Sequence, residues 1–259
     1  MILSRVLSRY FLAPFVLFLA LFSHLSLAKE KPDLTIAISL DIPPYVMQQA
    51  TYGLEVDIAR HALRDYKLHF IQLPYGELQK VISKGKVDGS IGVKFVDDST
   101  YYSVDFITFA NYAITKKVDG LTINGIGDLE NHQVSAWQNA YLVLGNEFKQ
   151  LFSPESPQRK NYTELADQRE QVSSFWQGKQ DVAVIDLSIF THFSKEMGHS
   201  MDEVSLHPIF PPITNYKVGF KDREVRDQFN SGWNELCESG KYDMILKLYD
   251  VALERTACR

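Results

Sequence analysis

Two stretches of the chain, at residues 78–93 (LQKVISKGKVDGSIGV) and 172–189 (VSSFWQGKQDVAVIDLSI), repeat one pattern of hydrophobic and polar positions about 90 residues apart. In each, an amphipathic run reaches a Gly-Lys pair, and an Asp two residues later opens a short apolar run. This order predicts a helix that ends at a glycine, a turn and a buried strand. Each stretch follows another strand-and-helix pattern, so the chain is expected to form two α/β lobes with a ligand-binding cleft between them.

The first part of the chain alternates strand and helix patterns. The expected elements are a strand at 34–40, a helix at 53–66, a strand at 68–73, a helix at 75–83 and a strand at 87–93. In the first helix Val56, Ala59 and Leu63 share one face, with Glu55 and Asp57 at the electropositive N-terminal end. This order predicts a mainly parallel sheet with right-handed crossovers.

A polar segment at 116–120 marks the expected exit from the first lobe. The elements expected after it are a strand at 133–136, a helix at 140–152, a loop at 154–160, a helix at 163–177, a strand at 181–186, a helix at 187–197, an irregular segment at 208–212, a strand at 216–220 and helices at 224–239 and 242–253. The last of these are expected to rejoin the first lobe. Lobe one would then comprise residues 29–115 and 216–259, and lobe two residues 116–215. Two crossings between the lobes would permit a hinge motion.

The N-terminus has the pattern of a secretory signal peptide at residues 1–28. Arg5 and Arg9 precede an apolar run at 10–22, and small residues precede a cleavage site after Ala28. An uncleaved membrane anchor is the alternative, although Pro14 and the short apolar run argue against it. The full chain carries a net charge of −5, and loss of the two arginines would make it more acidic. Binding to nucleic acid or to an anionic membrane through bulk charge is therefore not expected.

The two cysteines, Cys237 and Cys258, lie near the C-terminus. In an oxidising compartment they are expected to form a disulfide that holds the last helix and the tail, with two free thiols as the alternative. Neither has the neighbours that a zinc site requires, and the seven histidines are scattered without metal-ligand spacing. The chain shows no nucleophile elbow, phosphate loop or dinucleotide motif, so we expect no metal, no cofactor and no catalytic residues.

Seven segments together resemble the family 3 solute-binding proteins, the periplasmic type that binds polar amino acids. They occur in the family's order over nearly all of the mature chain: LTIAISLDIPPYV, GLEVDIARHAL, LQKVISKGKVDGSIGV, VDFITFANYAI, IGDLENHQVSAW, FWQGKQDVAVID and ESGKYDMILKLY. The resemblance implies a periplasmic, two-lobed clamp that acts as a monomer and closes on one small polar solute, an amino acid or a related amine. The partner would be the membrane permease of an ATP-driven (ABC) importer or a membrane sensor protein.

The resemblance also places ligand-binding positions in the first lobe, and there this chain departs from the family. The family's carboxylate-binding Arg falls at Ser99, counted from Gly92, and residues 94–100 contain no Arg. A hydroxyl cannot replace the bidentate contact of a guanidinium group, so the ligand either lacks an α-carboxylate or binds it differently. Lys94 falls where the family has a hydroxyl residue, and it is a candidate for a positive charge in the cleft, with a solvated surface lysine as the alternative.

In the second lobe, the family's anion-binding turn aligns with Asn139 and Ala140, after Trp137. Backbone N–H groups at a helix start can bind an anion there, or Asn139 can simply cap the helix. Asp186 ends a strand at the position of the family's amine-binding acid, and capping of the next helix is its alternative role.

The loop after the first strand offers Asp41 and Tyr45 as further ligand contacts. Tyr45 and Trp137 would form aromatic walls, which with Asp41 and Asp186 suit a cationic or amino-bearing solute. Core packing is the alternative role for each aromatic residue.

Three functions follow from these patterns. The leading one is a non-catalytic module whose closure depends on a solute that contacts both lobes. The second is a lyase- or dehydratase-like enzyme on the same fold, with Asp186, Asp98 and Lys94 as candidates for acid and base. The third is an empty clamp that acts through protein contacts.

Overall fold

The computed structural model of the chain describes residues 30–94, 97–252 and 256–258. The predicted signal peptide at residues 1–28 lies outside the described residues. The segment Met1–Pro32 is a unit separate from Asp33–Arg259, and its described residues 30–32 have no regular secondary structure. No helix in the described part of the chain combines the length and the apolar character needed to cross a bilayer.

The first lobe is built on a sheet with the strand order β2-β1-β3-β11-β4, in which β5 also pairs with β11. Its strands are β1 (Asp33–Ser39), β2 (Lys67–Leu73), β3 (Gly89–Val93), β4 (Tyr101–Tyr102), β5 (Ile107–Phe109) and β11 (Thr214–Phe220). Strand β1 runs parallel to both β2 and β3, as the sequence predicts, whereas β11 runs antiparallel to β3, β4 and β5.

The second lobe is built on a sheet with the order β10-β6-β9-β7-β8. Its strands are β6 (Asn111–Lys116), β7 (Val134–Trp137), β8 (Tyr162–Leu165), β9 (Val182–Asp186) and β10 (Val204–His207). Strand β7 is parallel to β8 and β9, and β6 is antiparallel to β9 and β10. This sheet therefore begins at Asn111 and includes residues that the sequence analysis grouped with the first lobe.

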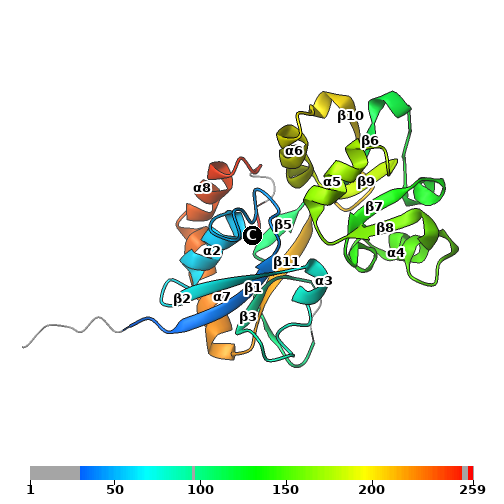
Figure 1. Cartoon of the computed structure of the whole chain (residues 1–259). Helices are drawn as coiled ribbons and strands as arrows, with labels where there is room; N and C mark the ends of the chain where they lie inside the picture. Colours follow the sequence, from blue (N-terminus) through cyan, green and yellow to red (C-terminus); the bar gives the residue numbers. More distant parts are fainter. Residues whose placement is uncertain (1–29, 95–96, 253–255, 259) are drawn as a thin grey trace, which may run out of the picture. The chain divides into compact units, whose positions relative to one another are not determined.

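Helices cover each sheet (Figure 1). The α-helices are α2 (Leu54–Ala62), α3 (Tyr75–Leu78), α4 (Asn146–Phe152), α5 (Gln168–Trp176), α6 (Leu187–Glu196), α7 (Arg223–Glu238) and α8 (Lys241–Leu248), and the short 3-10 helices are η2 (Lys117–Asp119), η3 (Ile126–Asn131), η4 (Ala140–Leu142), η5 (Pro157–Asn161) and η6 (Met201–Glu203). Helices α2, α7 and α8 pack on one another beside the first sheet, and α5 packs on α6 beside the second. The two-lobed α/β fold predicted from the sequence is thereby confirmed, but both sheets are mixed rather than mainly parallel, because β11 in the first and β6 in the second run antiparallel to their neighbours.

Several predicted boundaries were wrong. The helix expected at 75–83 ends at Leu78, and the helix expected at 140–152 is divided into η4 and α4 at Gly145, whose φ is 102°. The helix expected at 163–177 begins only at Gln168, because the preceding segment pairs with β7 as strand β8. Asp167 fixes this start, since its side chain accepts hydrogen bonds from the N–H groups of Arg169 and Glu170. Strand β10 was not predicted.

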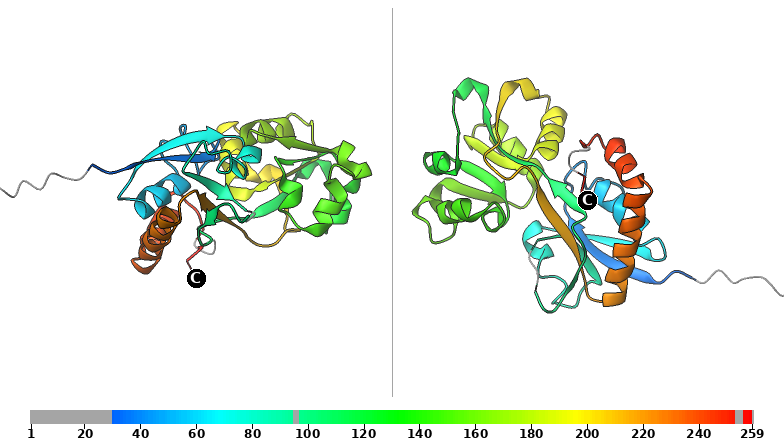
Figure 2. Two further views of the ribbon diagram at one scale, coloured as in Figure 1. Left: turned by 90° about the horizontal axis from the view of Figure 1, so that it is seen from below. Right: turned by 180° about the vertical axis from the view of Figure 1, so that it is seen from behind.

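Two extended segments link the lobes side by side. Strand β5 continues through Ala110 into β6, and the segment after β10 returns as β11. Where they pass, β5 and β11 form an antiparallel pair in which Phe109 faces Thr214 and Ile107 faces Tyr216. Figure 2 shows the β11 strand in orange beside the green strands that lead to β6. A pair of adjacent crossings of this kind is the geometry in which a few residues can serve as a hinge.

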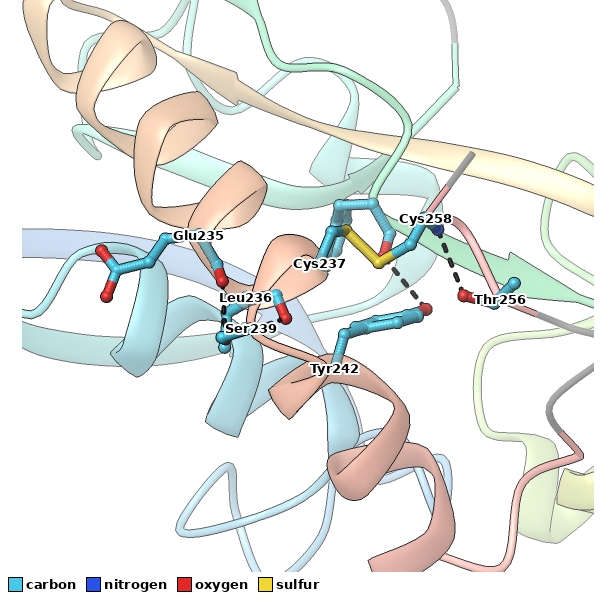
Figure 3. The surroundings of a disulfide bond; sticks show 8 residues. Glu235, Leu236, Cys237, Ser239, Tyr242, Thr256 and Cys258 are labelled. Atoms are coloured by element: carbon cyan, nitrogen blue, oxygen red, sulfur yellow. Dashed lines mark hydrogen bonds between the residues drawn. A yellow bond between two sulfur atoms is a disulfide. The ribbon is translucent and has the colours of Figure 1, made fainter.

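The predicted disulfide between Cys237 and Cys258 is present. Figure 3 shows that it joins α7 to the C-terminal tail, beside Tyr242 of α8. The ring of Tyr242 is fully buried and packs 4.7 Å from the ring of Trp233, centroid to centroid. The covalent bond therefore fixes the tail over the helical layer of the first lobe.

Candidate functional site

A cavity of about 40 Å³, here named the central pocket, lies between the two sheets. The first lobe contributes Ser39, Ile42, Glu55, Tyr75, Leu78, Ile91, Gly92, Phe109 and Tyr216 to its lining, and the second lobe contributes Asn111, Trp137, Gln168, Asp186 and Ile189. A cavity of this size holds about three water molecules, or a chemical group of similar volume. A ligand in it would contact both lobes at once.

The topology of the sheets explains why these side chains meet. Ser39, Trp137 and Asp186 are the last residues of β1, β7 and β9, which are strands of the parallel parts of the two sheets. Carboxyl ends of parallel strands border the crevice in open α/β sheets, and helices begin directly beyond them. Gln168 and Tyr75 are such first helical residues, in α5 and α3.

Aromatic rings form much of the wall. The ring of Tyr216 lies 5.2 Å from the ring of Phe109 and 6.2 Å from that of Tyr75, both in edge-to-face geometry. Trp137 closes the opposite side and is 6% exposed. Burial raises the pKa of Tyr216 well above its usual value, so its hydroxyl stays neutral. The walls are therefore formed by aromatic rings, and the hydroxyl of Tyr216 among them is neutral.

Asp186 lines the pocket, and its carboxylate is already held by protein groups. Its Oδ1 accepts hydrogen bonds from the N–H groups of Ser188 at 2.9 Å and Ile189 at 3.2 Å, which caps α6. The same oxygen lies 3.3 Å from the hydroxyl of Tyr45, and Oδ2 accepts from the N–H of Ala110 at 2.7 Å. The helix-capping alternative is therefore confirmed, and the binding of a ligand amine by Asp186, which lines the pocket, stays a prediction.

Glu55 is the second carboxylate of the pocket, and it differs from Asp186 in having no protein partner for its charge. It lies in the first turn of α2 and is 2% exposed, and no hydrogen bond or ion pair joins its carboxylate to a described residue. Burial raises the pKa of this carboxyl to about 8, since nothing nearby stabilises the charged form. The side chain of Ser39, at the end of β1, likewise has a buried hydroxyl without a hydrogen-bond partner. The described part of the pocket therefore contains polar groups that no protein atom satisfies.

Asp41 and Tyr45 shape the loop after β1 and are not among the residues that line the central pocket. The carboxylate of Asp41 accepts hydrogen bonds from Gln49 N at 3.0 Å and Gln72 Nε2 at 2.7 Å. Tyr45 is fully buried, and its ring packs 4.3 Å from the ring of Phe109. Tyr45 thus supports an aromatic residue of the pocket wall from behind, while Asp41 holds the loop.

In the sequence, Gly92, Lys94 and Ser99 are the residues connected with the missing arginine. Of these three residues, only Gly92 lines the central pocket. The ammonium of Lys94 donates to the carbonyl of Asn215 at 3.0 Å and lies 5.7 Å from the centre of the Tyr216 ring. Burial lowers the pKa of Lys94, an effect that the nearby Asp105 opposes. Ser99 is exposed and hydrogen-bonds to Asp97, two residues before it.

The predicted anion-binding turn has a different role in the structure. Asn139 takes a left-handed conformation with φ of 59° and makes no side-chain capping bond, and Ala140 is fully buried in the short helix η4. Neither residue lines the pocket. The preceding residue, Gln138, instead accepts a hydrogen bond from the N–H of Gly76, so this segment contacts α3 of the first lobe.

Sequence reasoning missed several lining residues, most notably Glu55, Tyr75, Phe109 and Tyr216. A signal for Glu55 was present, because Ile58, Ala59 and Ala62 follow it at three, four and seven residues, which is the spacing of one helical face. An acid on the apolar face of a helix indicates a buried carboxylate. The three aromatic residues lie in segments that looked like ordinary core, and no sequence signal separates them from it.

Comparisons with known proteins identify solved structures of similar fold. No protein-family model matches this chain, and no match was found among the curated proteins. Among solved structures, the chain is similar to a substrate-binding protein of an ABC uptake transporter from Streptococcus pneumoniae with bound histidine. The TM-score is 0.70 at 16% identity, over 85% of this chain and 94% of the other.

Two more solved structures are comparable. A histidine kinase sensor domain with similarity to periplasmic binding proteins gives a TM-score of 0.69 at 16% identity, over 84% of this chain and 95% of the other. An amino-acid ABC transporter substrate-binding protein from Streptococcus pneumoniae bound to L-arginine gives 0.67 at 18% identity, over 85% and 94%. The fold of this chain is that of the two-lobed substrate-binding proteins and related sensor domains.

Proposed function

We propose that this chain is a non-catalytic solute-binding protein whose two lobes close on a small polar solute, an amino acid or a related amine. The observation on which the proposal rests is the lining of the central pocket, which comes from both lobes, including Glu55 from one and Asp186 and Trp137 from the other. A solute that contacts both lobes binds the closed form better than the open form, and this difference is what shifts the equilibrium.

The adjacent crossing strands support the same proposal. Strands β5 and β11 pair where the chain passes between the lobes, so a change of backbone angles there would rotate one lobe against the other. Contacts such as Tyr45 to Asp186 and Gly76 to Gln138 join the lobes only while they are close together. They would therefore break in an open form and re-form on closure.

An enzymatic function has less support. Asp186 is committed to four hydrogen-bond donors, and neither Asp98 nor Lys94 lines the central pocket. Among the described residues of the pocket, no acid and base stand as a hydrogen-bonded pair, as general acid–base catalysis would require.

Export and delivery complete the proposal. The signal-peptide pattern at residues 1–28 and the disulfide between Cys237 and Cys258 suit an oxidising compartment, such as the periplasm. The compared structures include both transporter proteins and a sensor domain. The closed form would accordingly be recognised by the permease of an ABC importer or by a membrane sensor.

A thermal-shift screen tests the proposal. The mature protein, refolded to remove any co-purified solute, is mixed with amino acids, amines and carboxylates. A solute at about 100 times its dissociation constant should stabilise the protein by about 2.7 kcal/mol. Gln168→Ala should weaken binding of the hit, because this side chain lines the pocket. Gln177→Ala, just beyond the other end of α5, is the control that should bind normally. A protein that no solute stabilises contradicts the proposal.

A further inference from the structure

We infer that the solute of the central pocket is an organic cation without a carboxylate group, and that Glu55 is the residue that recognises its charge. The inference rests on the proposed function and narrows it, since it names the chemical class of the solute. Glu55 and Asp186 are acidic, and none of the described lining residues is Lys, Arg or His.

The two acids are not equivalent. Asp186 accepts hydrogen bonds from three backbone N–H groups and lies within reach of the Tyr45 hydroxyl, so the protein itself stabilises its carboxylate. Glu55 is equally buried, and no described residue offers it a donor or a positive charge. A buried carboxylate without a partner is costly unless it is protonated or a cation joins it. A cation in the pocket would therefore stabilise the ionised form of Glu55, which no described residue does.

The groups around Glu55 leave this assignment unchanged. Tyr75, Tyr216 and Asp186 line the pocket together with Glu55, and none of them can be a cation. Helix α8 packs on α2, but its neighbour Tyr249 donates to Asp57. Helix α7 also packs on α2, and its Glu235 pairs with Arg64, just after the end of α2.

The pocket walls specify an organic cation. Four aromatic side chains, Tyr75, Phe109, Tyr216 and Trp137, line the pocket. Aromatic rings attract an ammonium or guanidinium group by cation–π contact, and they accommodate the carbon atoms attached to it. A hard metal ion requires six or more oxygen ligands, which these rings do not supply. No three His, Cys, Asp or Glu side chains in the described part of the chain are grouped as a metal site would need.

A carboxylate on the solute would be unfavourable in this lining. It would lie beside Glu55 and Asp186 and would find no positive partner among the described residues of the pocket. The ammonium of Lys94 donates to the carbonyl of Asn215 and lies 5.7 Å from the centre of the Tyr216 ring, and Lys94 itself does not line the pocket. Like charges in a site of low dielectric repel strongly. An amine should thus bind better than the amino acid from which it differs by a carboxyl group.

Matched solutes provide the test. Butylamine, cadaverine and agmatine are compared by isothermal titration calorimetry with norvaline, lysine and arginine, the corresponding amino acids. At least one amine should bind at least tenfold more tightly than its amino acid. Tighter binding of the amino acids overturns the inference but leaves the proposed function intact, whereas no binding by any solute in either this assay or the wider screen contradicts the proposed function itself.

Variants of Glu55 test the residue. Glu55→Gln keeps the size of the side chain and should lower amine affinity at least tenfold. Glu77→Gln removes the same charge from an exposed side chain next to the lining residue Leu78, and should leave affinity unchanged. Amine binding by Glu55→Gln that equals the wild type overturns the assignment. The unfolding temperature of the free variant shows that it is folded.

The pH dependence separates charge recognition from simple packing. These amines keep their charge below about pH 9, so a change in their affinity with pH reports a change in the protonation of the protein. Because binding requires ionised Glu55, affinity should rise about tenfold for each pH unit until the pKa is reached. The slope should vanish in Glu55→Gln. An equal slope in the variant and the wild type would overturn the role of Glu55.

Discussion

The backbone N–H of Gly76, in α3 of the first lobe, donates a hydrogen bond of 3.0 Å to Oε1 of Gln138, directly after β7 of the second lobe. Both residues lie next to pocket-lining positions, Tyr75 and Trp137. The bond therefore connects the two walls of the pocket at its rim, and it exists only when the lobes are close.

Gln138→Ala should weaken solute binding about fivefold, because closure would lose one hydrogen bond worth about 1 kcal/mol. Titration calorimetry with a solute identified in the screen provides the measurement. Gln133→Ala is the matched control, since its side chain bonds to Asn161 within the second lobe. If the two variants bind alike, the bond between Gly76 and Gln138 does not contribute to closure.

The stability of the free protein should fall as the pH rises from about 4.5 to about 8. Glu55 keeps its proton in the folded protein up to its pKa of about 8, while in the unfolded chain it loses the proton near its ordinary value. The unfolded state therefore binds fewer protons in this window, and the free energy of unfolding decreases with pH by a few kcal/mol.

Urea unfolding at several pH values measures this effect. In Glu55→Gln the free energy of unfolding should lose the decrease with pH that Glu55 causes, so this variant should become more stable relative to the wild type toward pH 8. Glu77→Gln should show the same pH dependence as the wild type. Parallel profiles for the wild type and Glu55→Gln would show that this carboxyl is not buried without a partner.

Removal of the disulfide should destabilise the first lobe. Cys237 and Cys258 are 21 residues apart, and a closed loop of this length contributes about 3 kcal/mol in the chain-entropy model. The double variant Cys237→Ser and Cys258→Ser should lose this amount in urea unfolding. Reduction of the wild type should give the same loss, and a reducing agent should not alter the variant. A variant as stable as the oxidised wild type contradicts a stabilising role.

Gly53 should tolerate no side chain. Its φ is 135°, and a Cβ atom there would lie 2.3 Å from the carbonyl oxygen of Tyr45. Gly53→Ala should lower the free energy of unfolding by more than about 3 kcal/mol or prevent folding. The backbone of Gly53, or that of Tyr45 and Val46, would have to move to make room for the Cβ atom. Gly127→Ala, whose Cβ would meet no atom within 4 Å, is the control and should be nearly neutral. Equal stability of the two variants would contradict the tight packing of the loop after β1.

Much of the fold follows from short-range patterns in the sequence. The apolar runs that became β1, β3 and β9 are buried strands of parallel pairings, and their neighbours in sequence have helical periodicity. Strand β8 was predicted as helix because its pairing with β7 is a tertiary contact that overrides local propensity. The antiparallel course of β11 has the same cause, because local sequence does not reveal which strand a distant segment will join.

The candidate site could be predicted only in part from the sequence. The position of Asp186 at a strand end predicted its place beside the pocket, since strand ends meet there in this fold. By contrast, Tyr45 lies behind the wall, and Phe109 takes the position at the pocket, because packing between lobes decides which ring is exposed to a cavity. Glu55 was interpreted as a helix-terminal charge, although its spacing to Ile58 and Ala62 placed it on the buried face.

Small-angle X-ray scattering of the mature protein, with and without a solute that binds, tests closure most directly. On saturation with the solute the radius of gyration should decrease, and the curve should approach the one calculated from the described structure of residues beyond Asp33. Glu55→Gln, under conditions where an amine saturates only the wild type, should keep the larger radius. A solute that saturates the protein while the radius of gyration stays constant would contradict the closing of two lobes around it.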